Sequence, residues 1–364
     1  MFGKVYNGKK ILITGHTGFK GSWLTTWLLK LGANVIGVSK DIPSNPSMFE
    51  LLKFEQKICH YQDDIRDLKR MTEIISKEKP DFVFHLAAQP IVSKSYTDPI
   101  ETITSNVLGT THVLESLKLS NHKCIAVLIT SDKAYENVEQ LWGYRENDQL
   151  GGKDIYSGSK GASELIIKSY LFSFFNKVTS NVRIGIGRAG NVIGGGDWAE
   201  DRIVVDCVKA WSQNKVVDIR NPLATRPWQH VLEPLSGYLT LGQLLANNAN
   251  LHGEAFNFGP NSDQNYTVQE LIKDLSKYWG NDNQSQIFKS INEKPFNEAG
   301  LLKLNCDKAL QVLNWKMNLG YLDNIRYTGE WYFDYYENKK NMYEKTLAQI
   351  SEYEDQAISK KFKW

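Results

Sequence analysis

Tyr156 and Lys160 are the residues of this sequence whose types and spacing point most directly to chemistry. They lie four positions apart where a helix is expected to begin and extend past Tyr170, so both side chains project from one face. A lysine ammonium beside a tyrosine favours the phenolate, which lowers the tyrosine pKa and makes it a useful base. The lysine can also hold a ribose hydroxyl. Because Y-x-x-x-K is common on helix surfaces, this interpretation depends on the surrounding sequence.

A glycine-rich turn near the start of the chain supplies part of that support. The apolar run Ile11–Ile13 predicts a buried strand, Gly15, Gly18 and Gly21 follow it, and residues 22–29 predict a helix. Such a turn brings backbone N–H groups and a helix N-terminus onto one spot, which suits a bound diphosphate. The same glycines also fit an ordinary strand–turn–helix corner. The strand before, the helix after and the position near the start favour a dinucleotide site.

The elements that must position these residues alternate along the chain. Strands are expected at 32–39, 80–89, 124–131 and 182–189, with helices from about 63 to 79 and over 100–119. This order predicts an α/β fold with a Rossmann-type doubly wound parallel sheet. Ligands of such sheets bind beyond the carboxyl ends of the strands, so Gly15, Ala87 and Ser131 should converge on one crevice. A smaller substrate-covering region is expected beyond Asn191, with segments that interleave with the first domain.

Ser131 ends one expected strand and completes a Ser–Tyr–Lys set that resembles the site of the short-chain dehydrogenases/reductases. This likeness implies that Ser131 hydrogen-bonds the reacting hydroxyl while Tyr156 takes its proton and a hydride passes to a nicotinamide. Asp132 and Lys133 follow directly. Two charges at a strand end are a common surface pattern, but here they lie where the crevice is expected. A carboxylic acid there could protonate a leaving hydroxyl and an amine could remove a carbon-bound proton, which predicts elimination of water.

The sequence resembles the CDP-glucose 4,6-dehydratases, within the extended short-chain dehydrogenase/reductase superfamily and its NAD-dependent epimerases and dehydratases. The likeness runs from about Lys10 to Gly280. It is carried by these stretches: 14–24 (TGHTGFKGSWL), 87–90 (AAQP), 130–137 (TSDKAYEN), 142–147 (WGYREN), 156–161 (YSGSKG), 188–198 (RAGNVIGGGDW) and 226–239 (RPWQHVLEPLSGYL). The Thr-Ser-Asp-Lys and Arg-Pro-Trp-Gln-His blocks are far more specific than the glycine triplet.

The resemblance implies a redox-neutral cycle on a nucleotide-linked glucose. Tyr156 and tightly bound NAD would oxidise C4 to a ketone, which acidifies the C5 proton. Loss of that proton to Lys133 and protonation of the C6 hydroxyl by Asp132 would expel water, and the hydride would return to C6. The product is a 4-keto-6-deoxy sugar still attached to its nucleotide, as used in deoxysugar biosynthesis such as that of O-antigen lipopolysaccharide. Which of these pathways it would enter stays open.

The resemblance also implies roles for particular residues. The catalytic candidates are Ser131, Asp132, Lys133, Tyr156 and Lys160. The cofactor-binding candidates are Gly15, His16, Thr17, Gly18, Phe19, Gly21, Ser39, Asp41, Asp64, Ile65, Ala87, Ala88, Gln89, Asn106, Thr130, Tyr156 and Lys160. The substrate-binding candidates are Asn191, Arg202, Arg226 and His230, the arginines because a guanidinium fork matches phosphate oxygens. The choice between NAD and NADP stays open at residues 39–41, where Asp41 could reach the ribose but Ser39 and Lys40 could tolerate a 2′-phosphate.

Three segments are therefore expected: an NAD-binding Rossmann domain over 1–190, a mainly nucleotide-sugar-binding region over 191–330 and a helical tail over 331–364. Val205 stands where the family usually carries proline, from which we expect a loosened loop. Lys133 follows Asp132 where the related dTDP-glucose dehydratases have an acidic residue, so the identity of the C5 base stays open. The two long helices, 100–119 and 156–175, are expected to pair protomers into a homodimer, with an apolar seam that includes Phe172, Phe174 and Phe175.

Composition excludes several other classes. The chain of 364 residues has 43 basic and 41 acidic side chains, a net charge of +2, so nothing favours nucleic acid or an anionic membrane as a partner. The four cysteines are far apart and lack metal-ligand spacing, so no metal site or disulfide frame is expected and reduced thiols in the cytoplasm are the default. No apolar run approaches the length of a membrane span.

Two alternatives stay open. The first is another enzyme of nucleotide-linked hexoses, either a 4-epimerase or a dehydratase for a different nucleotide. The second is a non-catalytic regulator that binds the cofactor, and the intact Ser131, Tyr156 and Lys160 count against it.

Overall fold

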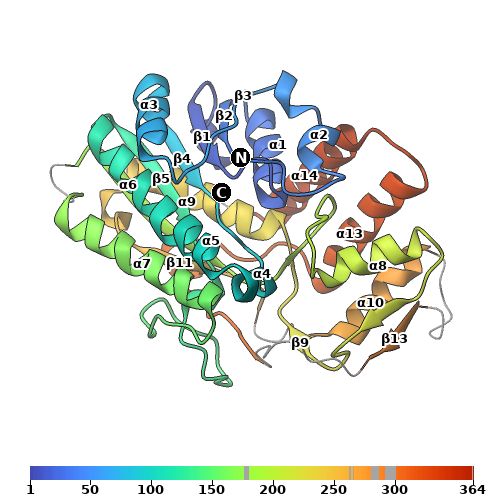
Figure 1. The fold of residues 1–364 in the computed structure, drawn as a ribbon. Helices are drawn as coiled ribbons and strands as arrows, with labels where there is room; N and C mark the ends of the chain where they lie inside the picture. The colour runs from blue at the N-terminus through green and yellow to red at the C-terminus, as the bar shows by residue number, and fades with distance from the viewer. Residues whose placement is uncertain (176–179, 262–263, 265, 280–286, 292–300, 363) are drawn as a thin grey trace.

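A seven-stranded parallel sheet forms the centre of the protein in the computed structural model, which describes residues 1–175, 180–261, 264, 266–279, 287–291, 301–362 and 364 (Figure 1). The strand order is β11-β6-β5-β4-β1-β2-β3. The strands are β1 (Lys10–Thr14), β2 (Asn34–Val38), β3 (Cys59–Tyr61), β4 (Phe82–His85), β5 (Cys124–Ile129), β6 (Val182–Ala189) and β11 (Ala255–Phe258). The chain runs outward from β1 in both directions, and this order is that of a doubly wound sheet, so the predicted fold class is confirmed.

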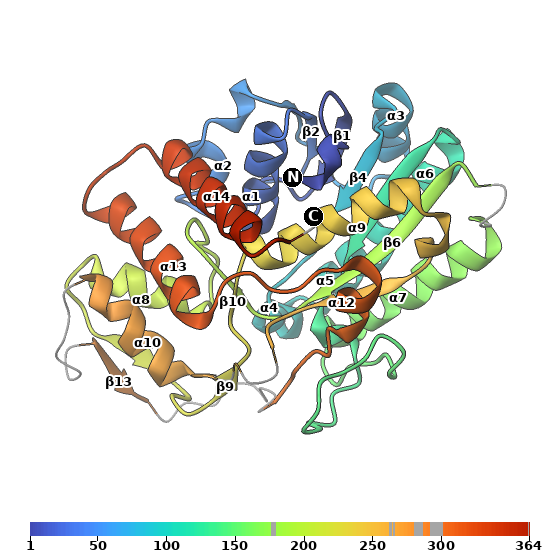
Figure 2. The same ribbon diagram turned by 180° about the vertical axis from the view of Figure 1, so that it is seen from behind.

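Helices cover both faces of the sheet because its strands are apolar on both sides. In β1, Leu12 faces one buried cluster while Ile11 and Ile13 face the other. One face carries α3 (Leu68–Glu78), α5 (Pro99–Ile103), a π-helix (Thr104–Leu108), α6 (Gly109–Ser120) and α7 (Ile155–Ser173). The other carries α1 (Phe19–Lys30), α9 (Leu232–Asn247) and α14 (Met342–Ser359), which Figure 2 shows from their own side.

Local signals set where the helices begin. The carboxylate of Asp67 accepts a hydrogen bond from the backbone N–H of Arg70 and caps α3, and Asp154 caps α7 in the same way through Ser157. The predicted helix over 100–119 is built from α5, the π-helix and α6 in continuous succession. A π-turn of this kind inserts an extra residue into the helix and re-aims the side chains on it.

A smaller region lies beyond one edge of the sheet, at the lower right of Figure 1. Its elements are β7 (Val192–Ile193), α8 (Ile203–Trp211), β8 (Val217–Ile219), β9 (Thr225–Arg226), β10 (Gln229–His230), β12 (Tyr266–Thr267), α10 (Val268–Ser276), β13 (Phe288–Ser290) and α13 (Tyr321–Tyr336). The helix α12 (Asp307–Leu313) instead packs against β11 and α9 of the larger region. Short elements complete the chain: α2 (Met48–Leu51), α4 (Val92–Thr97) and 3-10 helices at Phe2–Lys4, Phe54–Gln56, Asp132–Ala134, Ala249–Leu251 and Lys277–Trp279.

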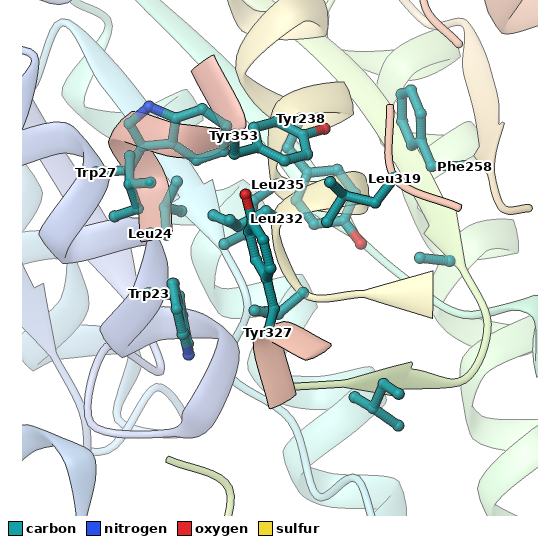
Figure 3. Packing of buried hydrophobic residues seen from close by; sticks show 14 of the residues in the cluster. Trp23, Leu24, Trp27, Leu232, Leu235, Tyr238, Phe258, Leu319, Tyr327 and Tyr353 are labelled. Atoms are coloured by element: carbon teal, nitrogen blue, oxygen red, sulfur yellow. The ribbon is translucent and has the colours of Figure 1, made fainter. Parts of the chain in front are cut away.

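A shared aromatic core joins the smaller region to the sheet. Side chains of α1, α9, α13, α14 and β11 meet there, as Figure 3 shows for Trp23, Trp27, Tyr238, Tyr327 and Tyr353. The two ends of the chain also meet, because the rings of Phe2 and Trp364 stack with their centroids 5.3 Å apart. The division of the chain at residues 190 and 330 stays a prediction.

The expectation of a loosened loop at Val205 is wrong. Val205 lies inside α8 with 1% of its surface exposed, and its side chain belongs to the larger apolar cluster. The first turn of a helix accepts either residue, because its N–H groups have no partner within the helix, so the change from proline does not loosen the chain here. The apolar seam expected from three phenylalanines is also divided: Phe172 and Phe174 are exposed, but Phe175 is buried in the core under α7.

Candidate functional site

The catalytic candidates meet where β5 ends and α7 begins. Ser131 precedes the 3-10 helix Asp132–Ala134 and caps it, since its Oγ accepts a hydrogen bond from the backbone N–H of Lys133 at 3.2 Å. Tyr156 and Lys160 lie in the first turns of α7, and Tyr156 shares a hydrogen bond with Ser131. The structure therefore brings serine, carboxylate and tyrosine together, in the arrangement that the strand–helix pattern predicts.

Asp132 is buried and held on two sides. Its Oδ1 accepts a hydrogen bond from Ser131 Oγ at 2.9 Å, and a Cβ added to Gly190 would lie only 2.7 Å from its Oδ2. Burial raises the pKa of Asp132, although the charge of Lys133 and the bond from Ser131 oppose this. A carboxyl group with a raised pKa holds a proton more readily near neutral pH, which suits a general acid.

The expected lowering of the Tyr156 pKa by Lys160 is wrong for this state of the protein. Burial raises the pKa of Tyr156, opposed by its hydrogen bond with Ser131 and by the charge of Arg202. Burial lowers the pKa of Lys160 itself to about 8. Both groups lose hydration where they are enclosed, and this outweighs the attraction between ammonium and phenolate that the four-residue spacing suggested.

A buried ion pair supports the catalytic helix from behind. Glu164, one turn after Lys160 on α7, pairs with Arg188 of β6, and neither side chain is exposed. The Nε of Arg188 donates to Oε1 of Glu164 at 2.7 Å, and the hydroxyl of Thr130 donates to the same oxygen at 2.6 Å. Arg188 also donates to the hydroxyl of Tyr135. Thr130, a cofactor candidate, directly precedes Ser131. Its side chain therefore links this part of the chain to α7.

The glycine turn is shaped for a phosphate group. A Cβ on Gly15, whose φ is +78°, would lie 2.7 Å from the backbone nitrogen of Ala87, and one on Gly21 would lie 2.2 Å from the carbonyl oxygen of Gly15. Gly18 precedes α1 without a side-chain cap, and no acidic residue follows in the first turn. The first N–H groups of α1 are thus open to an anion, so these residues fit the diphosphate of a dinucleotide.

The side chains of His16 and Thr17 form hydrogen bonds with residues next to the glycine turn. His16 is buried, with Nδ1 at 2.9 Å from Ser39 Oγ and Nε2 at 2.8 Å from Nδ1 of His60. Burial, aided by the charge of His60, lowers the pKa of His16 to about 3, so its ring is neutral. The hydroxyl of Thr17 donates to the carbonyl oxygen of Asp41 at 2.8 Å. What His16 and Thr17 contribute to the loop is its shape and its link to the end of β2.

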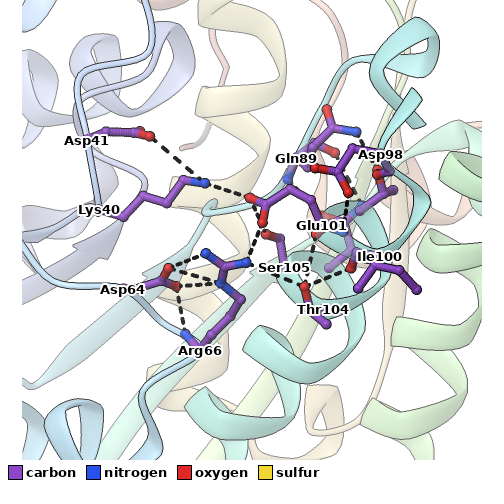
Figure 4. Close-up of polar contacts among 12 residues, drawn as sticks. Lys40, Asp41, Asp64, Arg66, Gln89, Asp98, Ile100, Glu101, Thr104 and Ser105 are labelled. Carbon is purple, nitrogen blue, oxygen red and sulfur yellow. Dashed lines mark hydrogen bonds and ion pairs between the residues drawn. The ribbon is translucent and has the colours of Figure 1, made fainter. Parts of the chain in front are cut away.

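A cluster of alternating charges lies beside the ends of β2 and β3 (Figure 4). Lys40 pairs with Glu101 at 2.6 Å and approaches Asp41 at 3.9 Å. Arg66 pairs with Asp64 at 2.6 Å and also with Glu101. Ile65, between them, is buried against Gly109, where a Cβ would meet it at 2.5 Å.

The residues that follow β4 form a second wall of the crevice. Gln89, after Ala87 and Ala88, donates its backbone N–H to Oδ1 of Asn106 at 2.8 Å. Asn106 lies in the π-helix and donates to Ser159 of α7 at 2.8 Å. At the bottom, Thr14 and His85 end β1 and β4 and are hydrogen-bonded at 2.7 Å. The strand ends that should converge on one crevice are therefore linked to each other and to α7.

A cavity of about 710 Å³ extends from the catalytic residues into the smaller region. Its wall includes Asp132 and Lys133 from the catalytic group, residues of α8 and the residues after β8. Asn191, Arg202 and Arg226 all line this central cavity. A cavity of this size suits a ligand in the range of a nucleotide-linked sugar.

Arg202 is the best placed of the substrate candidates for an anion. It precedes α8, and its buried Nε has no hydrogen-bond partner among the residues that the structure describes. Its charge acts on Tyr156 and on Asp197, so the guanidinium lies toward the catalytic end of the cavity. An arginine and the open N-terminus of α8 together fit a diphosphate.

His230 lies elsewhere. It is fully buried between Trp23 and Tyr327, whose ring centroids lie 5.5 and 5.3 Å from its own, and it does not line the cavity. Burial lowers its pKa to about 3. A substrate contact by His230 stays a prediction, and this packing favours a role in the core.

Lys20 and Asp197 are site residues that the sequence patterns did not indicate. Burial and the charge of Arg202 lower the pKa of Lys20 to about 8, while Asp132 and Asp197 oppose this. Asp197 lines the central cavity, and burial raises its pKa. In the sequence, the available signal for Lys20 was that it is a charged residue inside a glycine turn. Only the fold brings it near Arg202, Asp132 and Asp197.

The remaining features concern metal ligands, membrane-spanning helices and cysteines. Among the described residues, no three or more His, Cys, Asp and Glu side chains gather as a metal site would require. The described helices include none that is long and apolar enough to cross a membrane. All four cysteines are free.

Known proteins resemble this chain over most of its length. A family model described as GDP-mannose 4,6 dehydratase matches residues 12–328. The CDP-glucose 4,6-dehydratase of Salmonella typhimurium is 44% identical over 331 residues, which cover 90% of this chain and 91% of that protein. Among solved structures, the epimerase Mth375 of Methanothermobacter thermautotrophicus has a TM-score of 0.79 at 23% identity, covering 93% of this chain and 96% of its own.

A second solved structure is that of DesIV, a dTDP-glucose 4,6-dehydratase of Streptomyces venezuelae with NAD and TYD bound. It has a TM-score of 0.75 at 20% identity and covers 91% of this chain and all of its own. These two structural likenesses, both below 25% identity, concern the fold.

Proposed function

The chain belongs to the GDP-mannose 4,6-dehydratase family, within the NAD-dependent epimerases and dehydratases, and from that membership we propose that it converts CDP-glucose to CDP-4-keto-6-deoxyglucose and water. The nucleotide is taken from the Salmonella typhimurium relative. The observation that carries the reaction type is the pair Asp132–Lys133 directly after Ser131, at the catalytic end of a cavity sized for a nucleotide sugar.

We infer the orientation of the substrate from the residues that line the cavity. The glucose ring takes the catalytic end, beside Asp132 and Lys133, and the diphosphate lies at Arg202 and the N-terminus of α8. Arg226 on β9 also lines the cavity. The nucleoside extends toward β8.

In this orientation, a residue of this chain can be assigned to each proton transfer of the reaction. The glycine turn at Gly15, Gly18 and Gly21 would hold the diphosphate of NAD, which would supply a hydride acceptor for the oxidation of C4 and the donor for the return of that hydride to C6. Tyr156 takes the proton of the C4 hydroxyl, which Ser131 hydrogen-bonds. Lys133 removes the C5 proton that the new ketone acidifies, and Asp132, protonated because it is buried, gives its proton to the departing C6 hydroxyl. Water leaves, C5 takes a proton back from Lys133 as the hydride returns to C6, and the overall reaction is redox-neutral.

The charges at the adenosine end support NAD over NADP. A 2′-phosphate would need positively charged side chains that are not already paired with carboxylates. Lys40 and Arg66 both form ion pairs with Glu101. The Arg66 guanidinium also pairs with Asp64, and the Asp41 carboxylate lies exposed beside Lys40. A negative charge added there would meet three carboxylates.

The test is product analysis with purified protein and CDP-glucose in deuterated water. A 4,6-dehydratase gives a 4-keto-6-deoxy product with deuterium at C5, whereas a 4-epimerase gives an isomer of the substrate with no loss of water. Asp132→Asn keeps the shape of the side chain and removes its acid. We expect it to slow elimination by about 10²–10⁴-fold while C4 oxidation continues, so reduced cofactor accumulates and is seen by its near-ultraviolet absorbance.

Lys133→Met is the companion variant, since it removes the amine near the substrate C5 and keeps most of the side-chain volume. It should abolish exchange of the C5 proton with solvent.

Equal slowing of oxidation and elimination by Asp132→Asn would mean that Asp132 only positions the substrate. An isomer of CDP-glucose as the product would make the protein an epimerase.

A homodimer of a cytoplasmic enzyme is the assembly that we infer. The outer face of α5, α6 and α7 exposes large apolar side chains, namely Ile100, Ile103, Leu108, Leu165 and Phe172. These helices lie side by side on one face of the sheet (Figure 1). Light scattering of the purified protein should give twice the chain mass, and Leu165→Glu with Phe172→Glu should halve it. An unchanged mass in that double variant would place the interface elsewhere.

A further inference from the structure

The wall of the central cavity includes a carboxylate on α8, Asp206, that has no hydrogen-bond or ion-pair partner among the described residues. Asp206 lies in the first turn of α8, four residues after the N-cap residue Arg202, and both residues line the cavity. Among the described residues, no hydrogen bond or ion pair reaches its carboxylate. Its neighbours are Asp201, Lys209 and Arg220, whose charges act on it.

The substrate orientation decides what meets Asp206. With the sugar at Asp132 and the diphosphate at Arg202, one ribose separates the α-phosphate from the base, which comes to lie one turn further along α8. The wall there is apolar at Val204 and Ile219, which suits the faces of a planar ring, and polar at Asp206 and Arg220, which suits its edge.

We propose that Asp206 accepts a hydrogen bond from the 4-amino group of cytosine while Arg220 donates to its ring nitrogen or carbonyl oxygen, and that this pair selects the base of the nucleotide. The proposal rests on the proposed function, since it takes the orientation of a nucleotide-linked glucose from it. Cytosine presents a donor at position 4 beside acceptors at N3 and O2, and an Asp beside an Arg presents the complementary acceptor and donors.

Uracil and thymine are disfavoured by the same groups. Both carry a carbonyl oxygen at position 4 and an N–H at position 3, so an oxygen would face the Asp206 carboxylate and an N–H would face the arginine. Specificity then comes as much from this mismatch as from the bonds to cytosine. Burial and the charge of Asp201 raise the pKa of Asp206 to about 6, so its charged form is poorly stabilised until a donor arrives.

Another carboxylate of the cavity wall offers a matched control. Asp218 of β8 already pairs with Lys289 at 3.2 Å, and both side chains are exposed. Asp218→Asn removes the same charge as Asp206→Asn and leaves the acceptor capacity of Asp206 in place.

The experiment measures kcat/KM of the wild type, Asp206→Asn and Asp218→Asn with CDP-glucose, UDP-glucose and dTDP-glucose. The wild type should prefer CDP-glucose, and Asp206→Asn should reduce that preference by about ten- to a hundred-fold, because an amide can also donate to a carbonyl at position 4. The change should appear in KM more than in kcat, since the base is remote from the reacting carbons. Asp218→Asn should keep the wild-type preference.

Binding of CDP and UDP, measured by calorimetry, supplies a readout that does not depend on turnover. CDP should bind the wild type more tightly than UDP, and the two affinities should become nearly equal in Asp206→Asn. If Asp206→Asn keeps the wild-type preference by both measures, the inference is overturned and the proposed function stands. If the wild type forms no dehydrated product from CDP-glucose, the proposed function itself is wrong, and the base pocket is wrong with it.

Discussion

Replacing Arg188 by methionine should destabilise the protein severely, because it leaves the Glu164 carboxylate buried without its partner. Neither side chain is exposed, and Arg188 donates to Glu164 through both Nε and Nη2. Burial would lower the pKa of Arg188, but its hydrogen bonds and charge pairing with Glu164 raise it, so the pair is ionised. Breaking such a pair by removing one partner costs about 3–5 kcal/mol.

That cost is a large part of the 5–15 kcal/mol by which folded proteins are typically stable. For 364 residues, an unfolding entropy of about 2.1 cal/mol/K per residue converts it to a fall in Tm of ~4–7 °C. Thermal and urea unfolding followed by circular dichroism measure both quantities. The comparison needs Arg188→Met, Glu164→Gln and the double variant.

The double variant separates an unpaired charge from lost packing. Glutamine at 164 is neutral and can still accept the hydroxyl of Thr130, so adding Glu164→Gln to Arg188→Met should recover part of the stability. Activity should fall in Arg188→Met even at temperatures where it is folded, because Thr130 and α7 hold Ser131, Tyr156 and Lys160. A loss below about 1 kcal/mol in Arg188→Met, or a double variant as unstable as the sum of the single ones, would refute this reasoning.

Three further predictions concern the site and the core. Tyr156→Phe should lower kcat by at least about 10²-fold while nucleotide binding measured by calorimetry is kept, and near-normal turnover would remove Tyr156 from the proton transfer. Gly190→Ala should displace the Asp132 carboxylate, because the new Cβ would lie 2.7 Å from its Oδ2, and so slow elimination more than C4 oxidation in single-turnover measurements. Burial raises the pKa of Glu233 to about 7, above the ordinary 4.3 of the unfolded chain, so its contribution to stability is present below about pH 4 and is lost as the pH rises through 7. Urea unfolding of the wild type should therefore show a loss of about 3–4 kcal/mol from this group between pH 4 and pH 8, and Glu233→Gln should flatten that dependence.

The amino-acid sequence alone determined the parts of this protein that depend on neighbours along the chain. Ile11–Ile13 made a strand, Asp67 and Asp154 capped the helices that follow them, and the glycines at 15, 18 and 21 made the phosphate-binding turn. The crevice followed as well, because parallel strands that alternate with helices end at one edge of the sheet.

Only the tertiary structure decided how the site residues behave. It raised the pKa of Tyr156 rather than lowering it, paired Glu164 with Arg188, and brought Lys20 toward Asp197 across 177 positions of sequence (197 − 20). It also placed His230 in the core and left Asp206 lining the cavity, with no polar partner among the described residues. The reason is physical: spacing along a helix fixes direction, but desolvation and charge pairing depend on every segment that encloses a side chain, and those segments come from distant parts of the chain.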